Sequence, residues 1–383
     1  MSLRCGLLGE RLVHSRSPEI HKRLGSYEYL LYEKRPDEVE DFLLHGDYDV
    51  LNVTIPYKKV AFGLCNEVSP VAAELGNVNV VVKRLDGTLF GDNTDKAGFE
   101  RLVKIVDADV RDAKCVVLGT GGAAMTAAAA LRGLGAGRVV HISRSGEDNY
   151  GNLERNADAS VVVNATPVGM YPNVDAQPVS LSAFPKCKAV IDLIYNPAPT
   201  RLLAEAERLG IANVGGMPML EEQARLASLY MNANLYLYGP PGSGKSTYGR
   251  ILAERKRMPF VDLDEEIEKC SGRKIKDIFS SDGEDAFRKI ELSELERVSS
   301  VPGQVVALGG GALVNPAARA IAEATGRVVF IECDEAELLR RVAASCGRPL
   351  LAGNAEKRMR TLLESRREHY ASFRERITVP VMI

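Results

Sequence analysis

Two glycine-rich loops, 120 residues apart, have the spacing of phosphate-binding loops. The first reads Gly-Thr-Gly-Gly-Ala-Ala at 119–124, and the second reads Gly-Pro-Pro-Gly-Ser-Gly-Lys-Ser at 239–246. A Gly-x-Gly-x-x-Ala turn lets backbone approach a pyrophosphate at a helix N-terminus. In Gly-x-x-x-x-Gly-Lys-Ser, backbone N–H groups cradle phosphates, Lys245 reaches the β and γ oxygens, and Ser246 ligates Mg²⁺. The two loops predict two reactions, although the first spacing also fits an ordinary strand–turn–helix.

The residues after the next predicted strand bear on the choice of dinucleotide. This strand, at 139–142, ends in Ser143 and Arg144. An NAD site would usually place an acid here for the ribose 2′-hydroxyl, whereas arginine and hydroxyl groups suit a 2′-phosphate. The pattern therefore favours NADP, and a solvated surface arginine is the alternative. Glu147 and Asp148 follow closely and should weaken the affinity for a 2′-phosphate.

Several polar motifs precede the first loop, and each also has an ordinary structural interpretation. Ser17 before Pro18 has the pattern of a helix N-cap followed by proline at the first helical position. Asp95 could cap the next helix, and Lys58 could be a solvated helix lysine. The motifs are Ser15-Arg16-Ser17-Pro18, Asn52 to Lys58, Asn77-Val78-Asn79 and Gly91 to Asp95.

Further motifs follow the second loop. Asp262 and Asp264 end a predicted strand, and a glycine triplet at 309–311 follows another. Glu284 and Arg288 could be only an i,i+4 helix pair, and the glycine triplet could be only a turn. Arg348-Pro349 and Arg366 complete the set.

Short apolar runs alternate with helix-like segments along the chain, which predicts α/β architecture with parallel sheets. A length of 383 residues suggests two or three domains. We expect a substrate-binding α/β domain at 1–105, a Rossmann domain at 106–216, a returning helix and join at 217–232, and a P-loop domain at 233–383. The expected strands before the join are 4–8, 28–32, 48–54, 78–82, 114–118, 138–142, 160–164 and 188–194.

Composition excludes several classes of protein. The net charge is -2 and no block of five like charges occurs, so we expect no nucleic-acid partner. The seven cysteines lack metal-site spacing and are interpreted as reduced thiols. No apolar run approaches the ~18 residues of a membrane span. We expect a cytoplasmic protein that binds small molecules and not membranes; the sequence carries no signal of oligomeric state.

Residues 3–231 resemble shikimate dehydrogenase. The resemblance rests on the ordered motifs above, with Asn164 to Pro167, Asp192, Tyr195 to Pro197 and Gly216 to Ala224. It implies that Lys58 and Asp95 form the catalytic pair at the substrate carbonyl, where a positioned lysine can deliver a proton. The implied substrate-binding residues are Ser15, Ser17, Thr54, Asn79, Asp95, Tyr195 and Gln223. The implied NADP-binding residues are Gly119, Thr120, Gly121, Gly122, Ala123, Ser143, Arg144, Thr166 and Gly216.

Residues 235–379 resemble shikimate kinase on the remaining motifs. The resemblance implies that Asp264 binds the shikimate hydroxyls and assists the attacking one. Arg288 and Arg366 would hold its carboxylate, because guanidinium binds carboxylate bidentately, and Gly310 and Gly311 would approach it through backbone. The implied ATP-binding residues are Gly239, Gly242, Ser243, Gly244, Lys245, Ser246, Thr247 and Arg348, the last on a lid; the implied Mg²⁺ ligands are Ser246 and Asp262.

Together the resemblances imply a bifunctional enzyme of the shikimate pathway. NADPH would reduce 3-dehydroshikimate to shikimate, and ATP would phosphorylate shikimate at the 3-hydroxyl. One alternative is a first half that uses quinate and NAD, and another is a nucleotide-binding regulatory protein with inactive sites. The short join at 232–234 predicts a restricted arrangement of two halves, each with its own core and able to fold when cut near Ala233. We do not predict channelling.

Overall fold

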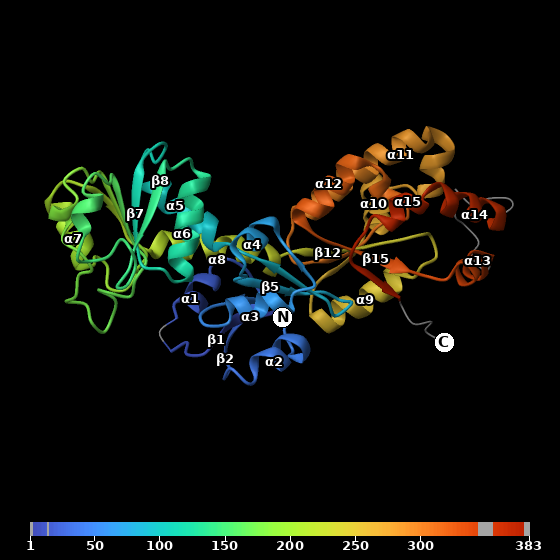
Figure 1. Ribbon diagram of the computed structural model, residues 1–383. Coiled ribbons are helices and arrows are strands. Elements are labelled where there is room, and N and C mark those ends of the chain that lie inside the picture. Colours follow the sequence, from blue (N-terminus) through green and yellow to red (C-terminus); the bar gives the residue numbers. More distant parts are fainter. Residues whose placement is uncertain (1–2, 14, 344–354, 379–383) are drawn as a thin grey trace.

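Three β-sheets lie in a row in the computed structural model, which describes residues 3–13, 15–343 and 355–378 (Figure 1). The sheet formed by the first strands occupies the middle, between the other two. Its strand order is β2-β1-β3-β5-β6-β4. The strands are β1 (Arg4–Gly9), β2 (Glu28–Glu33), β3 (Val50–Val53), β4 (Glu67–Val68), β5 (Val80–Lys83) and β6 (Leu89–Asp92), with helices α1 (Ser17–His21), α2 (Val39–His45), α3 (Lys58–Leu64) and α4 (Pro70–Leu75).

The expectation of parallel sheets is wrong for part of this first sheet. Strand β5 runs antiparallel to both β3 and β6. Only a tight turn joins β5 to β6, in which Arg84 N donates to Thr88 O at 2.8 Å and Gly87 has φ +85°. So short a connection can join only antiparallel neighbours, since a parallel crossover needs a dozen or more residues. The Asp86-Gly87 pair is the sequence signal for this hairpin.

The second sheet is entirely parallel, with order β11-β10-β9-β7-β8. Val116, Val162 and Val190 are completely buried, as expected where helices cover both faces of a parallel sheet. The elements are α5 (Asp95–Ile105), β7 (Lys114–Leu118), α6 (Gly122–Gly133), β8 (Arg138–Ile142), η1 (Leu153–Asn156), β9 (Val161–Asn164), η2 (Leu181–Ala183), β10 (Ala189–Asp192), α7 (Arg201–Arg208) and β11 (Ala212–Val214). Helix α8 (Met217–Met231) then packs on α5, α1 and β3.

The third sheet is also parallel, with order β13-β14-β12-β15-β16. Its strands are β12 (Asn234–Tyr238), β13 (Phe260–Asp262), β14 (Val305–Ala307), β15 (Gly326–Glu332) and β16 (Arg376–Thr378). Its helices are α9 (Lys245–Lys256), α10 (Leu263–Ser271), α11 (Ile275–Ser299), η3 (Ala312–Val314), α12 (Pro316–Thr325), α13 (Glu335–Ala343), α14 (Ala355–Ser365) and α15 (Arg367–Ala371). The α/β fold class predicted from the sequence is confirmed.

One hydrophobic cluster spans both halves, in addition to the core that each half was expected to have of its own. Each half does have separate clusters, but this one joins the first sheet, α8 and the third sheet. Only Asn232 and Ala233 separate α8 from β12, so the two apolar surfaces lie close enough to bury each other. The buried members are Leu3, Cys5, Tyr27, Val50, Val80, Val82, Ala227, Met231, Leu235, Leu237, Leu252, Ala253, Met258, Val305, Val329 and Ile331.

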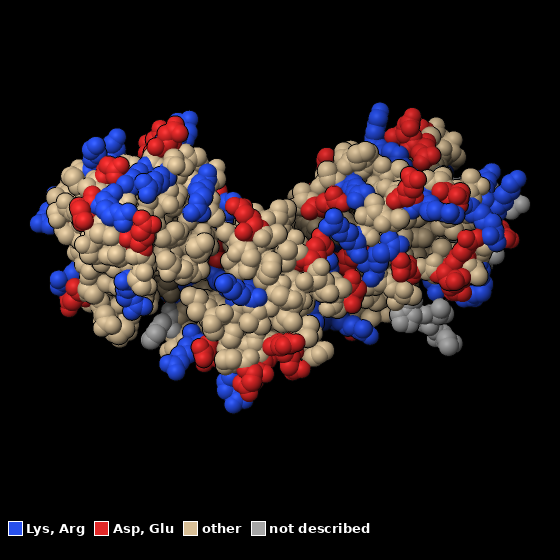
Figure 2. All heavy atoms as spheres, viewed as in Figure 1, with Lys and Arg blue, Asp and Glu red and all other residues tan. Residues whose placement is uncertain are grey.

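Polar contacts surround this shared cluster. Lys256 pairs with Asp49, whose other carboxylate oxygen accepts from Arg4 N at 2.9 Å. Leu85 N donates to Glu375 Oε1 at 3.0 Å. Elsewhere on the face shown in Figure 2, acidic and basic side chains are interspersed. The described residues include no helix long and apolar enough to cross a membrane.

Leu252→Ala tests whether the shared cluster couples the two halves. Removing this buried side chain should cost about 2–5 kcal/mol of unfolding free energy. Because Leu252 belongs to the cluster that includes Val50 and Val80, hydrogen–deuterium exchange should become faster in β1, β3 and β5 as well as in α9. The control is Leu295→Ala, an equally buried leucine in the cluster confined to the third sheet. Equal exchange in the first sheet of both variants would refute the coupling.

Two candidate active sites

A pocket of about 620 Å³ lies between the first and second sheets. Its walls combine residues of the first half's early loops with residues that follow β10 and begin α8. The residues implied to bind the first substrate are therefore brought together: Ser15, Ser17, Thr54, Asn79, Asp95, Tyr195 and Gln223 all line the pocket. Lys58 lines it too, with Ala123 and Gly216 from the implied NADP-binding set.

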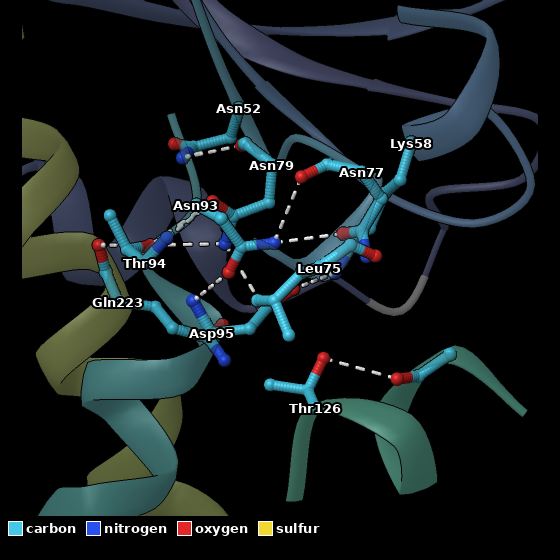
Figure 3. A network of polar contacts seen from close by, with 11 residues as sticks. Asn52, Lys58, Leu75, Asn77, Asn79, Asn93, Thr94, Asp95, Thr126 and Gln223 are labelled. Atoms are coloured by element: carbon cyan, nitrogen blue, oxygen red, sulfur yellow. Dashed lines mark hydrogen bonds and ion pairs between the residues drawn. The ribbon is translucent and has the colours of Figure 1, made fainter. Parts of the chain in front are cut away.

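An ion pair between Lys58 and Asp95 lies in this pocket, with 2.6 Å from Nζ to Oδ2 (Figure 3). The two residues begin α3 and α5, respectively. Asp95 is buried, and its second oxygen accepts from Asn79 Nδ2 at 2.9 Å. The lysine side chain is 26% exposed. Since an ammonium group has three donors, the contact with Asp95 leaves two for a pocket ligand.

A network of short polar side chains fixes Asp95 in place (Figure 3). Thr94 N donates to Asn79 Oδ1 at 2.8 Å, and Asp95 N donates to Asn93 Oδ1 at 2.9 Å. Asn93 Nδ2 in turn donates to Asn77 Oδ1 at 2.8 Å. The bonds from Thr94 N and Asp95 N satisfy two of the orphan donors at the start of α5, and the network joins this helix to the residues that flank β5 and β6. The geometry of the Lys58–Asp95 pair thus depends on residues that flank the hairpin, which the sequence interpretation missed.

His21 and Arg11 also line the pocket, and no role was predicted for either. His21 stacks on Tyr29 with 4.0 Å between ring centroids, and its Nδ1 lies 2.6 Å from the Tyr27 hydroxyl. Burial lowers the pKa of His21 from 6.5 to about 4. The imidazole is therefore neutral at physiological pH, which favours a packing and hydrogen-bonding role. No motif in the sequence marked Arg11.

The dinucleotide loop connects β7 to α6 and meets the pocket at Ala123. Gly119 has φ +109°, and a Cβ there would lie 3.2 Å from Thr166 Cγ2, so the turn requires glycine and brings Thr166 beside it. Around Gly121 and Gly122 no atom lies within 4 Å of an added Cβ. This open helix N-terminus fits a pyrophosphate. Gly119 N also donates to Ile142 O at 2.8 Å, which places the start of the Ser143–Arg144 loop next to it.

The second glycine loop connects β12 to α9 and contains three left-handed glycines, Gly239, Gly242 and Gly244. Lys245 is buried, and its Nζ donates to the carbonyl oxygens of Gly239 and Pro240, each at 2.9 Å. The buried Ser243 hydroxyl has no hydrogen-bond partner among the described residues. An orphaned hydroxyl and an ammonium group turned into the loop fit a bound phosphate chain.

The implied Mg²⁺ ligands belong to two different elements and do not form a closed metal site within the described residues. Ser246 is in the first turn of α9, and Asp262 ends β13, where its Oδ1 accepts from Asp264 N at 3.1 Å. The described residues contain no group of three His, Cys, Asp or Glu able to hold a metal ion. These two residues therefore fit an ion that takes most of its ligands from water and phosphates, as Mg²⁺ commonly does.

Two guanidinium groups converge beside this loop. A Cβ on Gly311 would lie 2.7 Å from Arg288 Nη2 and 3.0 Å from Arg366 Nη2. Arg366 Nη1 donates to Gly310 O at 2.8 Å. A Cβ on Gly310 would lie 2.8 Å from Pro241 Cδ, so the glycine triplet packs on the phosphate loop. The structure thus brings two guanidinium groups together at the glycine triplet, next to the second glycine loop.

Glu291 belongs to this cluster and was missed by sequence interpretation. Its Oε2 accepts from Arg288 Nη1 at 2.6 Å, while its buried Oε1 has no partner within the described part of the chain. Burial raises the pKa of the Glu291 carboxyl, and Arg288 opposes that rise. A Cβ on Gly309 would lie 2.8 Å from Glu291 Oε1 and 3.2 Å from Asp264 Oδ1. The only sequence signal was the i,i+3 spacing from Arg288.

Two other arginines bear on the second glycine loop, one predicted from the sequence and one not. Arg348, predicted to lie on a lid, falls outside the described residues. Arg341 on α13, which the sequence interpretation did not select, donates from Nη1 to Gly242 O at 3.2 Å. A cation from a neighbouring helix therefore contacts the phosphate loop.

The folds and sites define a dinucleotide-dependent oxidoreductase joined to a P-loop phosphotransferase, and comparisons with known proteins agree. Family models match at residues 7–81, the shikimate dehydrogenase substrate binding domain, and at residues 241–379, shikimate kinase. A shikimate dehydrogenase (NADP(+)) from Methanopyrus kandleri is 37% identical over 255 residues, covering 58% of this chain and 87% of the relative. A shikimate kinase from Thermobifida fusca is 47% identical over 137 residues, covering 36% of this chain and 78% of the relative.

A solved structure extends the agreement to three dimensions. Thermus thermophilus shikimate 5-dehydrogenase in complex with NADP(H) and shikimate is 32% identical, with a TM-score of 0.54. The match covers 59% of this chain and 92% of that one. The chain therefore belongs to the shikimate dehydrogenase family in its first part and to the shikimate kinase family in its second, as the sequence resemblance predicted.

The neutral His21 predicts an acid-dependent loss of stability. Its folded pKa is about 4, against 6.5 ordinarily, so the unfolded chain binds a proton first. The free energy of unfolding should be unaffected by this group above pH ~6.5 and fall by up to about 3 kcal/mol as the pH drops to ~4. Urea unfolding at about pH 7 and pH 4.5 should show a smaller loss for His21→Gln than for the unchanged protein. Identical losses would mean that His21 does not titrate in this way.

Proposed function

We propose that each activity of this bifunctional shikimate-pathway enzyme belongs to one of the two sites. The chain carries shikimate dehydrogenase and shikimate kinase domains, and it uses NADP and ATP. At the first site, 3-dehydroshikimate is reduced to shikimate; at the second, shikimate is phosphorylated at its 3-hydroxyl. The observation that carries the first assignment is the 2.6 Å Lys58–Asp95 pair, in the pocket that Ala123 of the dinucleotide loop also lines.

At the first site, Lys58 is proposed to deliver the proton to the substrate's carbonyl oxygen. The 119–124 loop would hold NADPH, which would supply the hydride. Asp95 holds the ammonium group of Lys58 and accepts a hydrogen bond from a substrate hydroxyl. Asn79 holds the Asp95 carboxylate in place. Ser15, Ser17, Thr54, Tyr195 and Gln223 share the pocket and suit the remaining hydroxyls and the carboxylate of the ring.

At the second site, Arg288 and Arg366 are proposed to bind the shikimate carboxylate at Gly311, where their guanidinium groups converge. Asp264 then orients the attacking hydroxyl, with Glu291 fixing Arg288. Lys245 stabilises charge on the transferred phosphoryl group, since phosphoryl transfer depends mainly on positioning and charge neutralisation. The contact between Gly310 and Pro241 supports a substrate bound directly beside the nucleotide phosphates.

The predictions on partners and on cellular location rest on the sequence. Small molecules are the expected partners, and no nucleic-acid or membrane partner is proposed. A cytoplasmic location is consistent with six free cysteines among the described residues.

Lys58→Ala should reduce dehydrogenase turnover by about 10²–10⁴-fold because it removes the proton donor. Phosphorylation of added shikimate should be unchanged. Lys59→Ala, at the exposed neighbouring lysine, serves as the matched control and should retain both activities. The rates are measured from NADPH oxidation and from shikimate 3-phosphate formed. Near-normal ketone reduction by Lys58→Ala would remove Lys58 from the catalytic assignment.

Lys245→Ala and Asp264→Ala should each silence phosphorylation and spare ketone reduction. Lys245 acts on the nucleotide and Asp264 on shikimate, so only the first variant should lose ATP affinity in a calorimetric titration. The expected loss of rate is on the order of 10²-fold or more, because charge neutralisation and positioning supply most of the catalysis. If Asp264→Ala keeps a normal kinase rate, the shikimate-binding assignment is wrong.

A further inference from the structure

The loop after β8 carries charges that oppose its proposed role. Arg144 is expected at the cofactor's 2′-phosphate, but Glu147 and Asp148 lie on the same turn. Ser143 N donates to Asp148 O at 3.3 Å, and a Cβ on Gly146 would lie 2.7 Å from Ser143 Oγ and 3.1 Å from Asp148 O. The backbone of Asp148 is therefore held beside Ser143, and Glu147 belongs to the same short loop.

The electrostatic consequence for a 2′-phosphate is unfavourable. A phosphate monoester carries about −1.5 to −2 charges at pH 7. One arginine and two carboxylates give the loop a net negative charge of its own, and an acid here ordinarily marks a site for NAD. A loop that favours NADP needs a further cation to neutralise these carboxylates.

Arg155, in η1, contacts both acids. Its Nη2 lies 2.9 Å from Glu147 Oε1, its Nη1 donates to the Glu147 carbonyl oxygen at 3.1 Å, and its Nε lies 4.0 Å from Asp148 Oδ1. Asn156, the next residue, donates from Nδ2 to the same Asp148 oxygen at 2.8 Å. Arg155 thus offsets one of the two negative charges, and contacts from η1 hold both acids in place.

We propose that Arg155 is a positioning residue for cofactor specificity. By holding Glu147 and Asp148, it leaves Arg144 available for the 2′-phosphate. Without Arg155, Glu147 is free to pair with Arg144, three residues earlier in the chain, and to repel the phosphate. This inference rests on the proposed function, which places the adenosine end of NADP at Ser143 and Arg144.

The test measures binding of NADP⁺ and NAD⁺ to the full chain by calorimetry, with MgADP saturating the kinase site. Arg155→Ala should raise the Kd for NADP⁺ about three- to tenfold, as expected for an exposed ion pair and a weakened charged hydrogen bond. The Kd for NAD⁺ should stay constant. Arg155→Ala combined with Glu147→Gln should recover most of the NADP⁺ affinity, and Arg155→Lys should retain part of it.

Control variants distinguish the role of Arg155 from the proposed placement of NADP at Ser143 and Arg144. Arg201→Ala removes an exposed arginine that pairs with Asp175 on the same domain, and should change neither affinity. Glu147→Gln alone, with Arg155 intact, should tighten NADP⁺ relative to NAD⁺. Equal loss of both affinities in Arg155→Ala, or no recovery with Glu147→Gln, would overturn the role of Arg155. If Arg144→Ala also leaves the preference intact, the proposed cofactor placement itself fails.

Discussion

Burial of apolar surface between the first and third sheets is the constraint on which the arrangement of this molecule depends. Only two residues separate α8, the last helix of the dehydrogenase half, from β12, the first strand of the kinase half. The cluster formed there includes buried side chains of β1, β3 and β5 as well as β12, β14 and β15. Burial on this scale is the dominant favourable term in folding, and it fixes the two halves relative to each other far more firmly than the join alone.

The two sites share a strand–glycine turn–helix arrangement and differ in the side chains that surround it. In each, a parallel strand ends in glycines that turn the chain into a helix, so that the helix N-terminus and exposed backbone amides can meet phosphate. The dehydrogenase adds a lysine and a buried aspartate at the starts of α3 and α5. The kinase adds a lysine inside the loop and two arginines at the glycine triplet. The chemistry diverges because different helices bring different side chains to similar loops.

Motifs that depend on neighbouring residues were predictable from the sequence, whereas features that depend on distant packing were not. The two glycine loops and the Asn93-Thr94-Asp95 motif have fixed local spacing. Glu291 had only an i,i+3 relation to Arg288, and its importance depends on which face of α11 is buried. The antiparallel β5–β6 pair was missed because the alternation of elements outweighed the short Asp86-Gly87 turn. The shared cluster depends on two sheets meeting, which apolar periodicity within one strand does not encode.

We propose that one chain carries out two consecutive reactions at separate sites. The most direct test is a time course with the purified protein, 3-dehydroshikimate, NADPH and MgATP, in which shikimate and shikimate 3-phosphate are resolved. One NADPH should be oxidised and one ATP consumed per shikimate 3-phosphate formed. Without ATP, shikimate should accumulate, and the rate of NADPH oxidation should be unchanged. NADPH oxidation that yields no shikimate 3-phosphate in the presence of MgATP would contradict this proposal.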